Sequence, residues 1–547
     1  MKRFIEDPCS HEFDIIIIGG GITGAAVAYE AASRGLKAAL VEKKDFACAT
    51  SAATSKLIHG GLRYLANAEF GLVRESLKER RTLENIAPNF VHPIPMMMVH
   101  DSVCPKNNPV EIGIGLRIYD ALSYDRNRTW DRGKKIPSHR KLSASEALVL
   151  EPGIFAQDMK SASVFYDCSN IFPERLTLSF IKSAVHHGAK VANYAKVTGF
   201  IMNGSGRVEG VKVDDVLTGT TTDLKAKLVV NCAGPWADLL LGLAKSSGSA
   251  GTGTLKRSEG IHIITKKIMN SHVVSYMTRE GRHFFLVPWR GHNLIGTTDQ
   301  PFTGNPDEYR VTRQSIQGLI DDVNNTLGSD VVSFDDVLYT YGGLRPLVED
   351  DSADTYGSSR RYEIYDNSVE GLEGLLTVEG GKFTTSRNLA EKTIDLVEKK
   401  LGKRPIASPT AKRYLWGSQI TDTKNFMLDL RRRNKDFGVT TLEYLGKNYG
   451  TEFEPVLELA RHDSEKAEVL NADGELMAQV AYAVRSEMAR TLSDIVLRRT
   501  GIATLGHPGG EVLEKVAINT AKELGWDSMR IDNEVATTSE ALRIPAF

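Results

Sequence analysis

The hydrophobic positions near the start of the chain predict a strand, a helix and a second strand. Residues 14–18, with four isoleucines in succession, predict a buried strand, residues 22–34 carry mostly small side chains, and residues 37–42 predict a second short strand. Three glycines separate the first strand from the helix. A buried strand that passes through a glycine turn into a helix and then into a second strand is a β-α-β unit.

Farther along the chain, short runs rich in β-branched residues alternate with helical stretches and glycine turns. Four of these runs cover residues 228–231, 261–264, 293–298 and 374–378. This alternation predicts an α/β body with an interleaved antiparallel part.

The last part of the chain follows a different pattern. A link that contains a proline at residues 403–405 closes the body, and from about residue 410 the apolar positions have helical spacing. Steps of four residues connect Leu476, Val480, Val484, Met488, Leu492 and Val496. We therefore expect a body at residues 12–404 and an all-helical C-terminal domain at residues 405–547.

Charge and cysteine content exclude several classes of protein. Lys and Arg number 68 against 69 Asp and Glu, so the chain has no overall attraction for nucleic acid, and we expect no such partner. Five cysteines occur without a CxxC pair, which argues against a disulfide scaffold or a zinc site. The sequence also lacks a calcium loop of the EF-hand type, so no bound metal is expected.

The hydropathy of the chain favours the cytoplasm. No run of about 18 apolar residues occurs, and residues 1–14 contain neither the apolar stretch of a secretory signal nor an Arg-rich leader. We expect a cytoplasmic protein that does not span a membrane.

The glycine turn carries the first chemical signal. Gly19 permits the tight turn from strand to helix, Gly21 lets a pyrophosphate approach the backbone, and Gly24 lets the helix pack closely on the strand. Glu42 ends the second strand at the spacing expected for a carboxylate that binds the ribose of an adenosine. A 2′-phosphate would be repelled there, so NAD and FAD remain as alternatives while NADP is disfavoured.

A second group of residues has the chemistry to contact the same cofactor. Hydroxyl groups and a cation suit pyrophosphate oxygens or the edge of a flavin, and small residues let a flat ring or a dinucleotide lie against the backbone. The residues concerned are Thr50, Ser51, Ser55, Lys56, Gly60, Gly61, Ala233 and Gly234.

Residues 46–65, FACATSAATSKLIHGGLRYL, resemble a segment of the FAD-dependent glycerol-3-phosphate dehydrogenases, which belong to the D-amino-acid oxidase-like flavoproteins. The resemblance continues through residues 231–238, 258–263, 296–299, 342–347, 379–387 and 487–500. It implies an FAD-binding Rossmann-like domain interleaved with an antiparallel substrate domain, followed by a helical cap. It also implies FAD as cofactor and oxidation of sn-glycerol 3-phosphate to dihydroxyacetone phosphate, with electrons passed to a quinone.

The same resemblance nominates residues for the substrate. Arg63, Tyr64, Arg345 and Arg360 are implied in binding glycerol 3-phosphate, and Lys382, next to Gly381, is implied beside both flavin and substrate. A planar Arg fork suits a dianionic phosphate, and the glycines and proline of residues 342–346 predict a sharp turn that aims Arg345 rigidly.

A base must accept the proton of the substrate hydroxyl, and imidazole suits that task near neutral pH. His59 and His262 are the two candidates, and the sequence does not choose between them.

Quinone reduction would require peripheral contact with the cytoplasmic membrane. Basic residues of the C-terminal domain could supply it, or could instead pair with Asp429, Glu487 and Asp494 inside the fold. These basic residues are Arg431, Arg432, Arg433, Lys435, Arg485, Arg490, Arg498 and Arg499. The apolar run at residues 96–99 is a further candidate for bilayer contact.

Three rival functions and one assembly remain open at this point. The first rival is an oxidase that gives its electrons to oxygen and forms peroxide, and the second is an amine-oxidising relative. The third rival, from another class, is a non-enzymatic redox sensor that binds a dinucleotide. A homodimer is compatible with the sequence.

Overall fold

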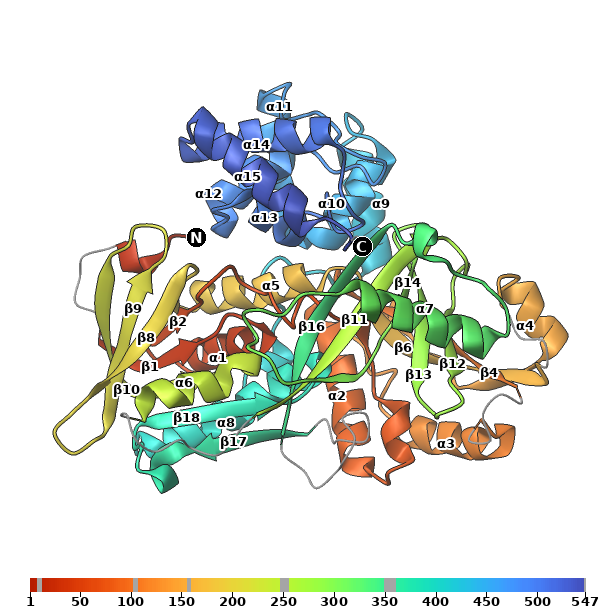
Figure 1. The fold of residues 1–547 in the computed structure, drawn as a ribbon, viewed down its shortest axis with the longest axis horizontal. Helices are drawn as coiled ribbons and strands as arrows, with labels where there is room; N and C mark the ends of the chain where they lie inside the picture. The colour runs from red at the N-terminus through yellow and green to blue at the C-terminus, as the bar shows by residue number, and fades with distance from the viewer. Residues whose placement is uncertain (7–11, 102–106, 155–158, 246–254, 349–360, 546–547) are drawn as a thin grey trace.

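The computed structural model describes residues 1–6, 12–101, 107–154, 159–245, 255–348 and 361–545. Two β-sheets with flanking helices form the body, and the C-terminal helices form a separate layer that covers one side of it (Figure 1). The predicted fold class, an α/β body with an antiparallel part and a helical C-terminal domain, is confirmed. The boundary between residues 404 and 405 stays a prediction.

The first sheet holds the predicted β-α-β unit. Its strand order is β17-β18-β10-β1-β2-β7, with β9 beside β10 and β8 beside β9. Strand β1 lies parallel to both β10 and β2, and its apolar run is buried because a central parallel strand is covered on both faces. The bounds of the eight strands are β1 Glu12–Ile18, β2 Ala38–Val41, β7 Lys190–Ala192, β8 Ala195–Met202, β9 Val208–Asp215, β10 Thr221–Asn231, β17 Tyr362–Asp366 and β18 Leu375–Gly380.

Helix α1 (Ile22–Ser33) connects β1 to β2 and packs against α5 (Pro173–His186) and α8 (Ser386–Lys400). Five of its twelve residues are alanines, and these are almost fully buried. Short side chains let the three helices approach closely, so the core of this half of the body is dense around α1.

The second sheet forms the other half of the body. Its order is β15-β11-β14-β13-β12-β4-β6-β3, with β16 beside β11 and β5 beside β6. The bounds of its ten strands are β3 Leu57–Ile58, β4 Val91–His100, β5 Arg140–Ser143, β6 Ser161–Asn170, β11 Lys256–Lys266, β12 Val273–Met277, β13 His283–Trp289, β14 His292–Gly296, β15 Gln300–Phe302 and β16 Tyr339–Leu347. The helices of this half are α2 (Phe70–Ile86), α3 (Pro109–Leu122), α4 (Ala144–Leu150) and α7 (Arg313–Leu327), while α6 (Ala237–Ala244) follows β10 of the first sheet.

Residues 342–346 form part of strand β16, so the predicted sharp turn is wrong. The strand pairs antiparallel with β11 from Tyr339 opposite Ile264 to Leu347 opposite Lys256. Its glycines permit close packing instead of a turn: a Cβ on Gly343 would lie 2.7 Å from the Cβ of Ala53.

The C-terminal layer consists of helices, as predicted. Its helices are α9 (Thr423–Arg433), α10 (Val439–Asn448), α11 (Phe453–His462), α12 (Ala478–Glu487), α13 (Leu492–Asp494), α14 (Gly510–Leu524) and α15 (Ser528–Ala541). The apolar residues at steps of four are all buried, but they do not share one helix. Helix α12 ends where Met488 adopts a left-handed conformation with φ 62°, and α13 begins after it.

The structure contradicts one of the two proposed sources of membrane contact, residues 96–99, and leaves the other, the basic residues of the C-terminal domain, as a prediction. Side chains 96–99 are between 0% and 7% exposed, because alternate residues of this inner strand pack into the hydrophobic cores on the two faces of the second sheet. Most of the C-terminal arginines pair within the fold: Arg432 with Asp429, Arg485 with Glu523, and Arg498 with Asp494. Glu487 pairs instead with Arg175 and Lys182 of helix α5.

Other side chains place apolar surface at the opposite end of the body. Val110 and Ile114 on α3 are 70% and 50% exposed, and Phe70, at the start of α2, is 46% exposed. In Figure 1, α3 lies at the lower edge of the body and the C-terminal helices lie at the top. Among the described residues no helix is long and apolar enough to cross a membrane.

Cys48, Cys168 and Cys232 are free thiols, whereas Cys9 and Cys104 lie outside the described residues.

Candidate active site

A large cavity of about 2220 Å³ is lined by the glycine turn, by strands of both sheets and by residues of α15. Pockets for small ligands usually measure roughly 300–1,000 Å³, so this cavity has room for a long cofactor together with a substrate. Within the part of the chain that the structure describes, no cluster of His, Cys, Asp and Glu is arranged to hold a metal ion.

The glycine turn and Glu42 form one end of the cavity. Gly19 has φ 107°, a conformation that glycine adopts without strain. The two carboxylate oxygens of Glu42 accept hydrogen bonds from the backbone N–H groups of Gly20, at 2.7 Å, and Lys44, at 2.8 Å. Burial raises the pKa of Glu42, while these two hydrogen bonds favour its charged form. The carboxylate is therefore fixed in place at the cavity wall.

Helix α1 directs its N-terminus into the same region. Gly21, Ile22 and Thr23 line the cavity, and Ser51 Oγ accepts a hydrogen bond from the Ile22 N–H at 2.9 Å. A Cβ on Gly24 would lie 1.9 Å from the carbonyl oxygen of Gly19, so this glycine serves helix packing and does not line the cavity. A helix N-terminus, an unobstructed glycine backbone and an oriented carboxylate suit the phosphates and ribose of a dinucleotide.

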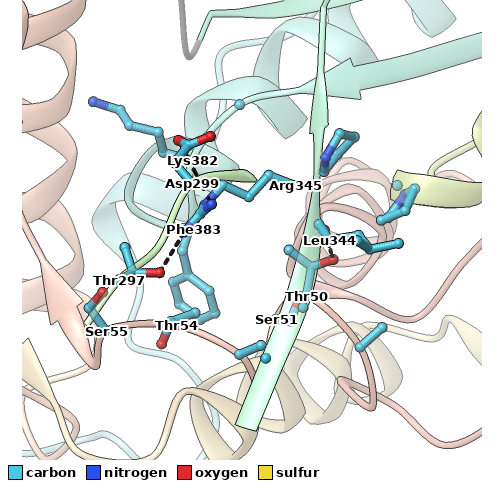
Figure 2. A pocket seen from close by; sticks show the side chains of 18 of the residues that line it. Thr50, Ser51, Thr54, Ser55, Thr297, Asp299, Leu344, Arg345, Lys382 and Phe383 are labelled. Carbon is cyan, nitrogen blue, oxygen red and sulfur yellow. Dashed lines mark hydrogen bonds and ion pairs between the residues drawn. The ribbon is translucent and has the colours of Figure 1, made fainter. Parts of the chain in front are cut away.

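The loop that follows β2 contributes a row of hydroxyl groups to the cavity. Figure 2 shows Thr50, Ser51, Thr54 and Ser55 along this loop. Thr50 donates a hydrogen bond to the Leu344 carbonyl at 2.6 Å, which ties the loop to β16.

Two residues near this loop lie away from the cavity, which contradicts their predicted contact with the cofactor. Lys56 is 4% exposed and pairs with Glu174 of α5 at 3.0 Å, because its left-handed backbone (φ 58°) turns it into the core. Gly60 is covered by Tyr119, whose hydroxyl accepts a hydrogen bond from the Gly60 N–H at 3.0 Å. The neighbouring Gly61 does line the cavity.

Arg345 reaches from β16 toward the residues that follow β14 (Figure 2). Its Nη2 donates to Thr297 Oγ1 at 2.7 Å and to the Thr298 carbonyl at 3.1 Å, and its Nη1 donates to the Glu259 carbonyl at 3.2 Å. Asp299 lies 3.9 Å from the same guanidinium. Arg345 is thus held rigidly, by this network of acceptors and not by a turn.

Lys382 is a second basic residue that lines the cavity, as His59 does. Lys382 donates a hydrogen bond to Ser76 Oγ and lies over the ring of Tyr64, 4.7 Å from its centroid. Desolvation, opposed by the carboxylate of Glu75 and aided by the nearby Arg63, lowers the pKa of Lys382 to about 7. Desolvation, aided by Lys382, lowers the pKa of His59 to about 4.

His262, on β11, is the other predicted base. Its Nε2 lies 2.8 Å from Ser55 Oγ, and its ring stacks on Tyr341 at 5.1 Å. Burial is the main cause that lowers the pKa of His262, followed by the charges of Arg345 and Lys56. Both histidines are therefore neutral near pH 7.

The structure brings most of the predicted site residues to this one cavity. Arg360 lies outside the described residues, so its predicted role is untested. The predicted residues that line the cavity are Gly19, Gly21, Glu42, Thr50, Ser51, Ser55, His59, Gly61, Arg63, Tyr64, Ala233, Gly234, His262, Arg345, Gly381 and Lys382.

Asp167 is a cavity residue that sequence reasoning missed. Its carboxylate accepts hydrogen bonds from Arg80 at 2.6 Å, from the Tyr119 hydroxyl at 2.7 Å and from the Gly60 N–H at 3.3 Å. It therefore holds the backbone next to His59. Asp167 lies within strand β6 among residues that look like ordinary strand residues, so the sequence carries no local signal for this role.

Comparison with known proteins agrees with this geometry. Residues 14–396 match the family described as "FAD dependent oxidoreductase", and residues 408–531 match the "C-terminal domain of alpha-glycerophosphate oxidase". The chain is 32% identical over 541 residues to a glycerol-3-phosphate dehydrogenase of Synechocystis sp.. The aligned region covers 96% of this chain and 95% of that protein. It is also 32% identical to an aerobic glycerol-3-phosphate dehydrogenase of Staphylococcus aureus, over 90% of this chain and 87% of the relative.

A solved structure supports the same relationship. The glycerol-3-phosphate dehydrogenase of Bacillus halodurans, complexed with FAD, superposes with a TM-score of 0.77 and 28% identity over 98% of this chain and 96% of that one. With the matched domains, these findings identify the cofactor as FAD. The chain belongs to the FAD-dependent oxidoreductase family, among the glycerol-3-phosphate dehydrogenases.

Proposed function

We propose that this protein oxidises sn-glycerol 3-phosphate to dihydroxyacetone phosphate, with hydride transfer from C2 to flavin N5 and electron transfer to a quinone. The observation that carries the proposal is the rigid Arg345 in the same cavity as the glycine turn and Glu42. FAD, when bound, supplies the hydride acceptor. The names of the relatives support the substrate.

The cations of the cavity support an anionic substrate. Arg63, Arg345 and Lys382 all line it, and Arg63 lies over the Tyr64 ring at 4.8 Å. Arg63 and Arg345 suit a phosphate dianion, because Arg offers paired donors to phosphate oxygens. An amino-acid substrate would place its own ammonium group among these charges, which disfavours the amine-oxidising alternative.

For the proton of the C2 hydroxyl, Lys382 is the base that we propose. A base works best when its pKa lies near the working pH, and the pKa of Lys382 is lowered to about 7. A pKa of about 4 makes His59 a weak base, and the pKa of His262 is also lowered. In this proposal the two neutral histidines orient the substrate by hydrogen bonding.

The apolar part of the cavity lining supports a quinone as acceptor. Besides its polar residues, the cavity is lined by Leu65, Phe70, Ile114 and Ile118, next to the exposed apolar side chains of α3. An apolar surface that continues into a cavity offers a route for a hydrophobic acceptor, and it would let this edge rest on a membrane. We propose peripheral contact through α3 in place of the C-terminal arginines.

An acceptor comparison tests this function. Turnover of glycerol 3-phosphate is measured with a soluble quinone and, separately, with dissolved oxygen, and glycerol and glycine serve as control substrates. We expect quinone-dependent turnover of glycerol 3-phosphate alone. Rapid peroxide formation without a preference for quinone would favour the oxidase, and FAD binding without turnover of any substrate would favour the redox sensor.

A further inference from the structure

Asp45 places a buried carboxylate between the C-terminal domain and residues 42–51, which we call the nucleotide loop. Its side chain is 0% exposed. One carboxylate oxygen accepts hydrogen bonds from Arg499 at 2.7 Å and Asn193 at 3.1 Å. The other accepts from Arg498 at 2.6 Å and from Arg499 at 2.8 Å. Two arginines of the C-terminal domain thus converge on one carboxylate of the body.

An unusual turn makes this convergence possible. Arg498 and Arg499 end a π-helical turn, Ile495–Arg499, that directly follows α13. Such widened turns are rare and often occur at functional positions. Arg498 is also fixed by Asp494 at 2.6 Å, and Arg499 donates to the Glu487 carbonyl at 3.0 Å. Contacts within the C-terminal domain therefore orient both guanidinium groups toward Asp45.

The residues after Asp45 contact the glycine turn and so connect Asp45 to it. The Ala47 N–H donates to the Gly20 carbonyl at 3.0 Å, and a Cβ on Gly20 would lie 2.7 Å from the ring of Phe46. The Gly20 N–H in turn donates to Glu42. A shift of Asp45 would therefore move both the glycine turn and the Glu42 carboxylate.

The two arginines act at a distance from the cofactor. Neither Arg498 nor Arg499 lines the cavity, whereas Glu42 and residues 47–51 of the nucleotide loop do. Their contact with the body is made to the side of the loop that faces away from the cavity. Arg498 and Arg499 can therefore hold the nucleotide loop in place without contacting the cofactor.

We propose that Arg498 and Arg499 are positioning residues for FAD. By fixing Asp45, they hold the nucleotide loop in the conformation that binds the adenosine half of the cofactor. Coupling between two binding events is reciprocal, so FAD binding in turn stabilises the docking of the C-terminal domain. The C-terminal domain is then a part of the FAD site, although Arg498 and Arg499 act on FAD indirectly, through Asp45.

Two variants test the proposal through FAD affinity. Arg498→Gln keeps the Arg499–Asp45 pair, and Asp45→Asn with Arg499→Met removes both charges together, so that neither is left buried without a partner. Apoprotein is titrated with FAD and binding is followed by flavin fluorescence. We expect both variants to bind FAD about tenfold more weakly or worse, within the usual range of coupling between sites.

Asp473→Asn is the matched control. Asp473 forms an ion pair with Arg290 at 2.7 Å, which also joins the C-terminal domain to the body, but at the turn between β13 and β14. This variant should lose stability while its FAD affinity falls far less than in the two test variants, since Asp473 does not hold the nucleotide loop. Unchanged FAD affinity in folded Arg498→Gln and paired variants would overturn the proposal, since a purely structural ion cluster would behave that way.

Hydrogen exchange of the unmodified protein decides the matter even where a variant fails to fold. Adding FAD to the apoprotein should slow amide exchange in residues 491–500, which lie outside the cavity. Exchange there that does not respond to FAD would contradict the coupling. Neither measurement depends on the substrate or the acceptor, so the result is independent of the proposed reaction.

Discussion

The ammonium group of Lys382 lies 4.7 Å from the centroid of the Tyr64 ring, in a half-buried position where desolvation lowers its pKa to about 7. The neutral amine, which alone can accept a proton, becomes the main form as the pH rises through this value. We therefore expect kcat/KM for glycerol 3-phosphate to rise with pH with a midpoint near 7.

Lys382→Arg keeps the positive charge at every accessible pH and so removes the base. We expect a loss of about 10²–10⁴-fold in kcat/KM, together with loss of the rise near pH 7. FAD content, read from the visible spectrum, controls for damage to the cofactor site. A rise with the same midpoint in this variant would assign the proton transfer to another group.

Arg345→Ala should weaken binding of the substrate and its transition state by about 2–5 kcal/mol, the scale for leaving a buried charge without its partner. Lysine should rescue poorly, because it lacks the planar fork. Thr297→Val removes only the hydroxyl that orients Arg345 at 2.7 Å, so it should cost about 1 kcal/mol. Near-normal kcat/KM in Arg345→Ala would move phosphate binding to Arg63 and Arg360.

Substitutions of Gly21 and of Gly24 should impair different properties, FAD binding in the first case and stability in the second. Gly24→Ala places a methyl group 1.9 Å from the Gly19 carbonyl, so it should lower the thermal stability of the apoprotein itself. A Cβ at position 21 would meet only Ser51 Oγ, at 3.1 Å, and in Gly21→Leu the rest of the side chain extends into the space where we expect the pyrophosphate. Its apoprotein should melt near the original temperature and bind no FAD. Melting curves with and without FAD distinguish the two, and normal FAD binding by Gly21→Leu would relocate the pyrophosphate.

Ile114→Glu should weaken membrane contact through α3. Ile114 is 50% exposed, so a charged residue there is tolerated in the fold but opposes burial in a bilayer interface. We expect reduced sedimentation with lipid vesicles and unchanged turnover with a soluble dye acceptor. Val369→Glu is the control, since Val369 is 89% exposed and does not line the cavity. Equal loss of vesicle binding in both variants would refute a specific role for α3.

Local patterns in the sequence were enough to predict the nucleotide half of the protein. The apolar run of β1, the glycines and Glu42 lie within about 30 residues, and the chemistry of each follows from its neighbours in the chain. The helical character of the C-terminal domain was predictable for the same reason, because helical spacing is a local property.

Long-range contacts account for the errors. The glycines near Arg345 suggested a turn, but pairing with β11 makes the segment a strand, and the partner Thr297 lies 48 residues away. Lys56 offered a suitable cation, yet Glu174 on α5 draws it into the core. An apolar run such as residues 96–99 reads the same in a sheet interior as on a surface, and only strand pairing distinguishes them.

The most direct test of the central claim is reduction of the bound flavin by substrate in the absence of oxygen. The purified protein is mixed anaerobically with glycerol 3-phosphate, glycerol or glycine, and the visible absorbance of oxidised FAD is followed before and after a quinone is added. The account predicts rapid bleaching by glycerol 3-phosphate alone and recovery of the absorbance on addition of the quinone. Flavin that stays oxidised with glycerol 3-phosphate but is reduced by glycerol or glycine would contradict it.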